Sequence, residues 1–135
     1  MTTPDLPAAD GPALVEAWRE LLARQAATSC ALDRELNERH GLGMSEFEVL
    51  ERLVEATSGD CAASVRIQEL AASVHLSQSA LSRLVARLEK DGLVQRSMCA
   101  EDRRGVSVCL TPGGRDRHTA ALPTHRAVLA AMLTR

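Results

Sequence analysis

Two adjacent arginines lie in a segment whose neighbours predict a hairpin turn. Asp102, Arg103 and Arg104 separate the runs LVQRSM and GVSVCL, both with strand-like alternation. An arginine can enter the narrow, A/T-rich minor groove of DNA, where the negative potential is enhanced. A charge-assisted pair with the Asp102 carboxylate would hold Arg104 in one pose. The spacing predicts Arg104 as the groove probe, Asp102 as its positioning residue and Arg103 as a phosphate contact or second probe. Alternatively, Asp102 and Arg104 only brace the hairpin.

A second group of polar and basic side chains lies in the first turns of a predicted helix that ends at Gly92. Its apolar stripe comprises Leu81, Leu84, Val85 and Leu88. In the major groove, glutamine reads adenine and arginine reads guanine, whereas a basic residue further along a helix contacts phosphate. An ordinary solvated face is the alternative interpretation. The candidate DNA-binding residues of this helix are Ser77 as N-cap, Gln78, Ser79, Ser82 and Arg83 for bases, and Arg87 for phosphate.

The elements around these residues predict a winged helix-turn-helix. A short helix over 67–74, the turn His75-Leu76 and the longer helix from Ser77 form the helix-turn-helix pattern, after a short strand near 65–67. The two alternating runs then form a hairpin attached after the longer helix, with Val106, Val108 and Leu110 on one face. We therefore expect a mainly α fold with a small β-hairpin wing, an α+β class.

Long helices are predicted on both sides of the winged helix. The first runs from Ala13 to about Arg39, and another starts at Ser45 with a Ser45–Glu48 capping box. The last begins with Pro112 after the N-cap Thr111, and Pro123 should kink or interrupt it. The expected organisation is a disordered lead over 1–12 and a single domain over 13–135, in which 13–43 and 112–135 are dimerisation helices and 44–111 binds DNA.

Composition narrows the function classes. The chain has 135 residues, a net charge of −2, one Trp, one Phe and no Tyr, so an aromatic platform for single-stranded nucleic acid is excluded. Acidic residues outnumber basic ones 12 to 5 over 1–60, whereas basic residues prevail 8 to 5 over 77–117. The sequence shows no enzyme motif, cofactor signature, metal-ligand spacing, membrane span or secretory signal. It therefore predicts a cytoplasmic, non-enzymatic protein with a polyanion-facing segment.

The strings LSQSALSRLVARLEKDGLVQR and DRRGVSVCLTPGGR resemble the MarR (multiple-antibiotic-resistance regulator) family of bacterial transcription factors. The resemblance runs from about Met44 to Arg117. It implies a winged-helix homodimer that binds a pseudo-palindromic operator in double-stranded DNA, usually as a repressor, with interleaved N- and C-terminal helices. It also implies release from DNA by a small aromatic or phenolic ligand, or by thiol oxidation in some members.

The sequence indicates the residues that would sense an effector less specifically than those that would bind DNA. Trp18, Arg24, Phe47 and His125 are the candidate effector pocket, although packing in the core or interface is the favoured interpretation of Trp18 and Phe47. Cys99, near several arginines, is the candidate redox residue of an alternative thiol-sensing regulator, or else an unreactive cysteine. An alternative of another class is a winged helix used only for protein–protein contact, which the arginines on both helix and wing disfavour.

Overall fold

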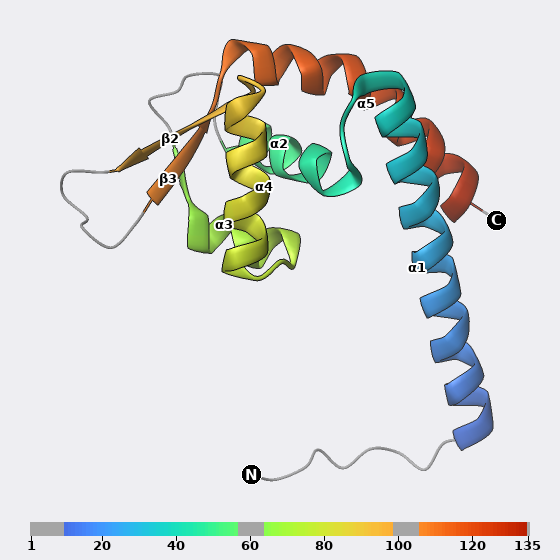
Figure 1. Ribbon diagram of the computed structural model, residues 1–135. Helices are drawn as coiled ribbons and strands as arrows, with labels where there is room; N and C mark the ends of the chain where they lie inside the picture. The colour runs from blue at the N-terminus through green and yellow to red at the C-terminus, as the bar shows by residue number, and fades with distance from the viewer. Residues whose placement is uncertain (1–9, 57–63, 99–105, 135) are drawn as a thin grey trace, which may run out of the picture.

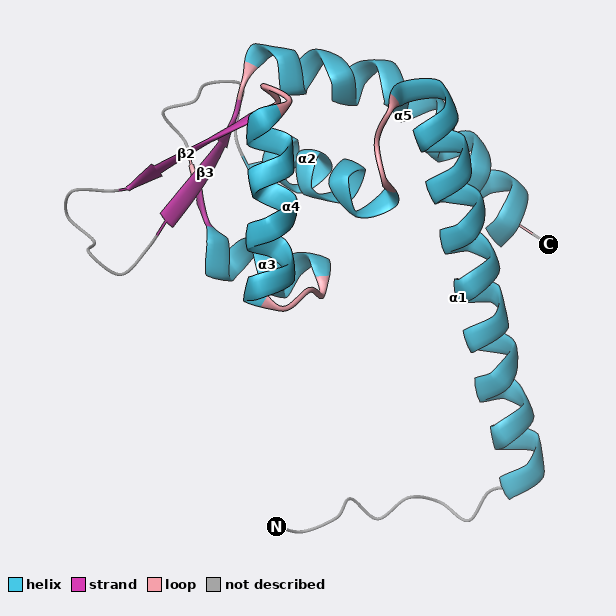
Figure 2. Ribbon diagram, viewed as in Figure 1, coloured by secondary structure: helices cyan, strands magenta, loops and turns pink. Residues whose placement is uncertain are grey.

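The computed structural model describes residues 10–56, 64–98 and 106–134, which form a winged helix between two long helices (Figures 1 and 2). The predicted mainly α fold with a small β wing is confirmed. The elements, in chain order, are α1 (Gly11–His40), α2 (Met44–Ala56), β1 (Val65–Arg66), α3 (Ile67–Val74), α4 (Gln78–Lys90), β2 (Val94–Met98), β3 (Val106–Leu110) and α5 (Pro112–Leu133).

The three strands form one antiparallel sheet in the order β1-β3-β2. Val94 pairs with Leu110 and Arg96 with Val108, which sets the hairpin register. Because β3 is the central strand, Ser107 and Cys109 are buried together with Val108 and Leu110. Both faces of β3 are therefore covered.

The core is mainly aliphatic, and its one benzyl side chain, Phe47, stacks on the buried imidazoles of His118 and His125. Helix α2 contributes Phe47 and Leu50, and α4 contributes Leu81, Val85 and Leu88, all with 0% exposure. These positions recur at helical spacing, so one stripe of each helix is removed from water. The opposite face of α4 is thereby directed to solvent.

Helix α1 begins at Gly11, two residues before the predicted Ala13, and its N-terminal part extends away from the rest of the molecule (Figure 1). Only Thr28, Leu32 and Leu36 of this helix are buried. Trp18 and Leu21 are 59% and 62% exposed. The large apolar side chains of its first half are therefore left mostly exposed by the rest of the described chain.

Helix α2 starts one residue earlier than predicted, and the expected Ser45–Glu48 capping box is wrong. The Gly43 amide donates to Glu46 Oε1 at 3.0 Å, and the Met44 amide donates to Asp33 Oδ1 on α1 at 3.0 Å. These carboxylates satisfy the amides that a helix start leaves open. Glu48 instead pairs with Arg52 at 3.3 Å.

Helix α5 continues through Pro123, which does not interrupt it. Figure 1 shows its first half crossing the top of the molecule and its second half turning down beside α1. A proline inside a helix removes one backbone hydrogen bond and favours such a bend. Thr111 is the N-cap of α5, as predicted, because the Gly114 amide donates to the Thr111 hydroxyl at 3.0 Å.

A close approach at the start of α5 requires glycine at position 114. A Cβ there would lie 2.0 Å from the Leu93 carbonyl oxygen and 2.9 Å from Leu110 Cδ1. We expect Gly114→Ala to lower the free energy of unfolding by about 2 kcal/mol, since backbone and a packed leucine would have to move. Urea unfolding followed by circular dichroism measures this.

The neighbouring glycine provides a matched control. A Cβ at Gly113 would lie 3.4 Å from its nearest neighbour, the Gly92 carbonyl oxygen. Gly113→Ala should therefore change stability by less than about 1 kcal/mol. Equal stability losses in the two variants would contradict the close-approach explanation.

Candidate nucleic-acid interface

The turn between α3 and α4 fixes the start of the exposed helix. His75 adopts the left-handed conformation at φ 59° and ends α3, and the Leu76 amide donates to the Ala71 carbonyl at 3.0 Å. Ser77 then caps α4, because its hydroxyl accepts from the Ala80 amide at 3.2 Å. The predicted helix-turn-helix and its N-cap are confirmed.

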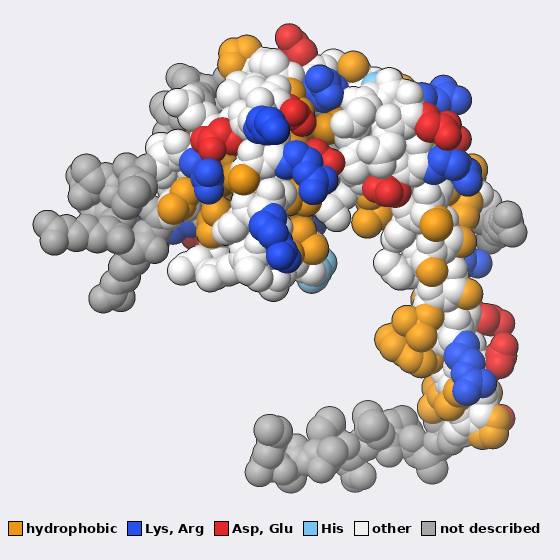
Figure 3. Space-filling model, in the orientation of Figure 1, with side chains coloured by type: hydrophobic (Ala, Val, Ile, Leu, Met, Phe, Trp, Pro, Cys, Tyr) orange, Lys and Arg blue, Asp and Glu red, His pale blue; other side chains and the backbone are white. Residues whose placement is uncertain are grey.

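The polar face of α4 is directed outward, as predicted. Gln78, Ser79, Arg83 and Arg87 are exposed and Ser82 is partly buried. Leu84, expected in the buried stripe, is only partly buried. Figure 3 shows basic side chains gathered on the face of the molecule where α4 lies. A helix with exposed polar and basic residues in its first turns has the form that enters a major groove.

Two of these basic side chains are anchored to neighbouring elements. Arg87 NH1 lies 3.9 Å from the buried Glu46 carboxylate, yet its side chain remains 69% exposed. On β2, Arg96 pairs with Glu89 of α4, with NH2 3.1 Å from Oε1. Sequence reasoning assigned no role to Glu89 or Arg96, although their separation spans the turn between α4 and β2.

Several predicted residues fall outside the described ranges. Asp102, Arg103 and Arg104 of the wing and the redox candidate Cys99 are among them. Their assigned roles stay predictions. Within the described residues, Cys30 is an exposed free thiol and Cys109 is disulfide-bonded.

The structure distributes the four candidate effector residues over separate places. Phe47 stacks on His125, with ring centroids 4.3 Å apart. Arg24 instead lines a surface hollow of about 300 Å³, and Trp18 lies further along α1. The hollow is formed by Leu21, Arg24, Gln25, Thr28, Ser29 and Leu133. Phe47 and His125 are thus brought together, whereas Arg24 and Trp18 do not join them.

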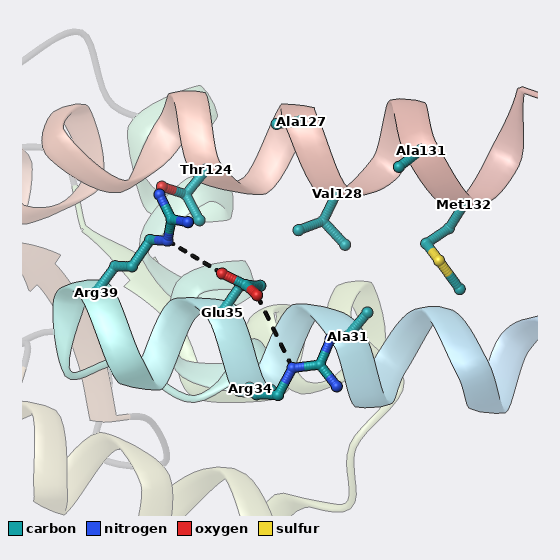
Figure 4. Close-up of a pocket in the computed structure, with 9 residues that line it drawn as sticks. All are labelled: Ala31, Arg34, Glu35, Arg39, Thr124, Ala127, Val128, Ala131 and Met132. Carbon is teal, nitrogen blue, oxygen red and sulfur yellow. Dashed lines mark hydrogen bonds and ion pairs between the residues drawn. The ribbon is translucent and has the colours of Figure 1, made fainter.

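A second hollow, of about 340 Å³, lies between α1 and α5 (Figure 4). Small and apolar side chains of α5 form one wall, and charged side chains of α1 form the other. Glu35 pairs with Arg39 at 3.0 Å and with Arg34 at 3.8 Å. None of the predicted effector residues lines it. The lining residues are Ala31, Arg34, Glu35, Arg39, Thr124, Ala127, Val128, Ala131 and Met132.

An ionic cluster with a buried carboxylate, Glu51, joins α2 to α5. Glu51 Oε1 accepts from Arg126 NH2 at 2.7 Å and lies 3.3 Å from His118 Nε2. Burial would raise the pKa of the Glu51 carboxyl, but hydrogen bonds from Arg126 and His118 outweigh it and lower the pKa below its ordinary value. The same contact raises the pKa of Arg126. Sequence reasoning missed this cluster because 67 or more positions separate its partners.

The cluster has one set of atoms with metal-ligand spacing. Donor atoms of Glu48, Glu51 and His125 lie within 4.8 Å of one another. Arg126 NH1, however, lies 2.6 Å from His125 Nδ1 and 3.2 Å from Glu51 Oε2. A guanidinium therefore already supplies the positive charge at this place, and the arrangement is that of an ion-pair network between helices.

His125 makes stability dependent on pH. Burial lowers the pKa of His125 below its ordinary value of 6.5, against the opposing effect of Glu51, while Arg126 and His118 lower it further. The unfolded chain then binds a proton near pH 6.5 that the folded chain rejects. The stabilisation from neutral His125 is complete above that pH and is lost as the pH falls below it.

We therefore expect the free energy of unfolding to fall between pH 7.5 and about pH 5.5. His125→Gln should flatten this slope, as measured by urea titration at several pH values. His75→Asn is the control, because His75 is exposed and asparagine tolerates its positive φ. An unchanged slope in His125→Gln would exclude His125 as the cause.

Comparisons with known proteins agree with this geometry. Residues 42–106 match the MarR family. The Streptomyces coelicolor MarR family regulator Sco3205, solved in complex with DNA, is 28% identical with a TM-score of 0.82, covering 96% of this chain and 79% of its own. AbsC from the same organism is 29% identical with a TM-score of 0.79, covering 96% and 83%.

A more distant structure shares the fold. A mutant of Escherichia coli MarR complexed with operator DNA is 23% identical with a TM-score of 0.74, covering 93% of this chain and 86% of its own. No curated protein matches the chain in sequence. None of the helices in the described ranges is long and apolar enough to cross a membrane.

Proposed function

We propose that this chain, whose residues 42–106 match the MarR family, is a regulator of that family and controls transcription by binding a specific double-stranded operator as a homodimer. The observation that carries this proposal is the exposed face of α4, where Gln78, Ser79 and Arg83 occupy the first two turns. These side chains match the hydrogen-bonding groups of base edges in the major groove. Arg87 would add affinity through a phosphate.

The exposed apolar face of α1 supports the homodimer. Leu14, Val15, Trp18, Leu21 and Leu22 are each at least 45% exposed, and Leu133 at the end of α5 is 47% exposed. An apolar patch of this kind marks an interaction site. A second copy would cover it with the same residues, and its two-fold symmetry would suit a pseudo-palindromic site with half-sites about 34–36 Å apart.

We propose further that the regulator is a bacterial, cytoplasmic repressor and that a small aromatic or phenolic ligand releases it from DNA. The hollows beside α1 and α5, about 300 and 340 Å³, are large enough for such a molecule. Arg24 lines the first and offers a cation to an acidic or phenolic group, whereas Arg34 and Arg39 of the second are paired with Glu35. Thiol oxidation at Cys99 is the alternative trigger.

Selection of bound duplexes from a random DNA pool tests the proposed function. A sequence-specific dimer should enrich one inverted repeat, with half-sites one helical turn apart. Titration of the enriched duplex with candidate aromatic acids, and separately with an oxidant, would then identify the trigger. Enrichment of no sequence above the unselected pool would contradict sequence-specific binding and favour a winged helix used for protein–protein contact.

A further inference from the structure

One contact joins the exposed part of β2 directly to α4. The Arg96 amide donates to Glu89 Oε2 at 3.0 Å, and Arg96 Nε donates to Glu89 Oε1 at 3.1 Å. Arg96 NH2 lies 3.1 Å from the same Oε1. Backbone and side chain of Arg96 therefore hold both oxygens of one carboxylate, which restricts direction as well as distance.

The contact between Glu89 and Arg96 lies where it can fix the orientation of β2 relative to α4. Leu93 and Val94, at the base of β2, are buried with 3% and 2% exposure. Beyond them Gln95, Arg96 and Ser97 are exposed, so the strand has left the core. Past this point, the Glu89 carboxylate fixes β2 relative to α4 independently of core packing. Both elements lead to predicted DNA-binding residues, α4 to Arg83 and β2 to the wing.

The charge of Glu89 makes its location unfavourable for a DNA-binding helix unless it has a structural role. The amide and then the guanidinium of Arg96 lower the pKa of the Glu89 carboxyl, so it is ionised at neutral pH. Glu89 lies on the same helix as Arg83, Arg87 and Lys90, so its negative charge reduces the net positive charge of α4 and the attraction of this helix for a polyanion. Its contact with Arg96 offers a reason for its presence.

We propose that Glu89 is a positioning residue for operator recognition, which sets the wing relative to α4 by holding Arg96. This inference rests on the proposed function, because it concerns the simultaneous fit of helix and wing to one duplex. Glu89 acts through Arg96 and touches no base in this proposal. Its effect should therefore appear in specific binding and be absent from binding to arbitrary DNA.

The direction in which Glu89→Gln changes the affinity for DNA distinguishes a positioning role from a purely electrostatic one. Glu89→Gln removes a negative charge from the DNA-binding helix, so electrostatics alone predicts tighter binding to every duplex. Positioning predicts about 10-fold weaker binding to the duplex enriched from the random pool, with binding to a scrambled duplex unchanged or tighter. Fluorescence anisotropy with both labelled duplexes, at one fixed salt concentration, measures the two affinities.

Asp91→Asn is the matched control. Asp91 is exposed two residues after Glu89, and within the described residues its side chain makes no hydrogen bond or ion pair. This variant loses the same charge without loosening β2, so it should bind both duplexes equally well or slightly tighter. Glu89→Asp, which keeps the charge but has a shorter reach, should show an intermediate loss on the enriched duplex. Circular dichroism of each variant verifies folding.

The outcomes are distinguishable. If the wild-type protein enriches an operator and Glu89→Gln binds it as tightly or more tightly, the positioning role is wrong while the proposed function stands. Equal weakening on the enriched and scrambled duplexes would also overturn the positioning role. If the wild-type protein enriches no sequence, the proposed function fails, and this inference fails with it.

Discussion

Replacing Trp18 and Leu21 together by glutamate is expected to make the protein monomeric and to weaken its binding to a two-half-site operator by about 100-fold or more. Both side chains are about 60% exposed on the part of α1 that extends from the body. Neither contributes to the core within the described ranges, so the fold of each subunit should persist. The apolar contact with a second copy would be replaced by buried, unpaired carboxylates.

The loss of affinity follows from linking two binding events. In a dimer, binding of one half-site places the second helix α4 beside the other half-site at a high effective concentration. A monomer loses this advantage and retains only the contacts of one α4 and its wing. Light scattering at micromolar concentration gives the mass, and gel shift with the enriched duplex gives the affinity.

The opposite face of α1 provides a control. Ala23 and Ala27 are exposed and lie about half a turn around the helix from Trp18, near Glu16 and Glu20. Ala23→Glu with Ala27→Glu adds the same two charges to this polar face and should leave the protein dimeric. A Trp18/Leu21 variant that keeps the dimer mass and wild-type affinity would show that a second copy does not cover this patch.

Arg83→Ala is expected to remove discrimination at one base pair in each half-site, at a cost of about 1–3 kcal/mol per half-site. Arg83 is exposed in the second turn of α4, where a side chain can reach base edges. Because both half-sites lose the contact, the dimer should lose about 2–6 kcal/mol of specific binding free energy. Repeating the DNA selection with the variant reveals which position has relaxed.

Arg87→Ala is the matched comparison, because it distinguishes the loss of a phosphate contact from the loss of a base contact. Arg87 lies one turn further along α4, faces Glu46 at 3.9 Å and is proposed to contact phosphate. Its removal should weaken binding similarly on all sequences and reduce the salt dependence. If Arg83→Ala also weakened binding uniformly and left base preference intact, Arg83 would be a phosphate contact.

Local chemistry explains which parts of the fold could be predicted. Ser77 and Thr111 cap their helices as expected, and Gly92 takes a positive φ of 76° after α4. Each signal depends on residues within a few positions of one another, so sequence spacing is sufficient to identify it. The helix-turn-helix and the hairpin follow from such signals.

Contacts between distant elements explain the rest. The start of α2 is set by Asp33 of α1, which no local pattern around Ser45 reveals. The Glu51–Arg126 pair and the stacking of Phe47 on His125 require knowledge of how α2 packs on α5. The same reason explains why the candidate effector residues, chosen as the only aromatics and nearby cations, are spread over separate places.

Dimethyl sulfate footprinting of the enriched operator tests whether two α4 helices enter successive major grooves, since this reagent reports guanine N7 atoms in the major groove. We expect two protected patches whose centres are about 10–10.5 base pairs apart, and loss of both patches in the Trp18/Leu21 variant. A single patch, or protection without this spacing in the wild-type protein, would contradict the placement of two α4 helices in successive major grooves.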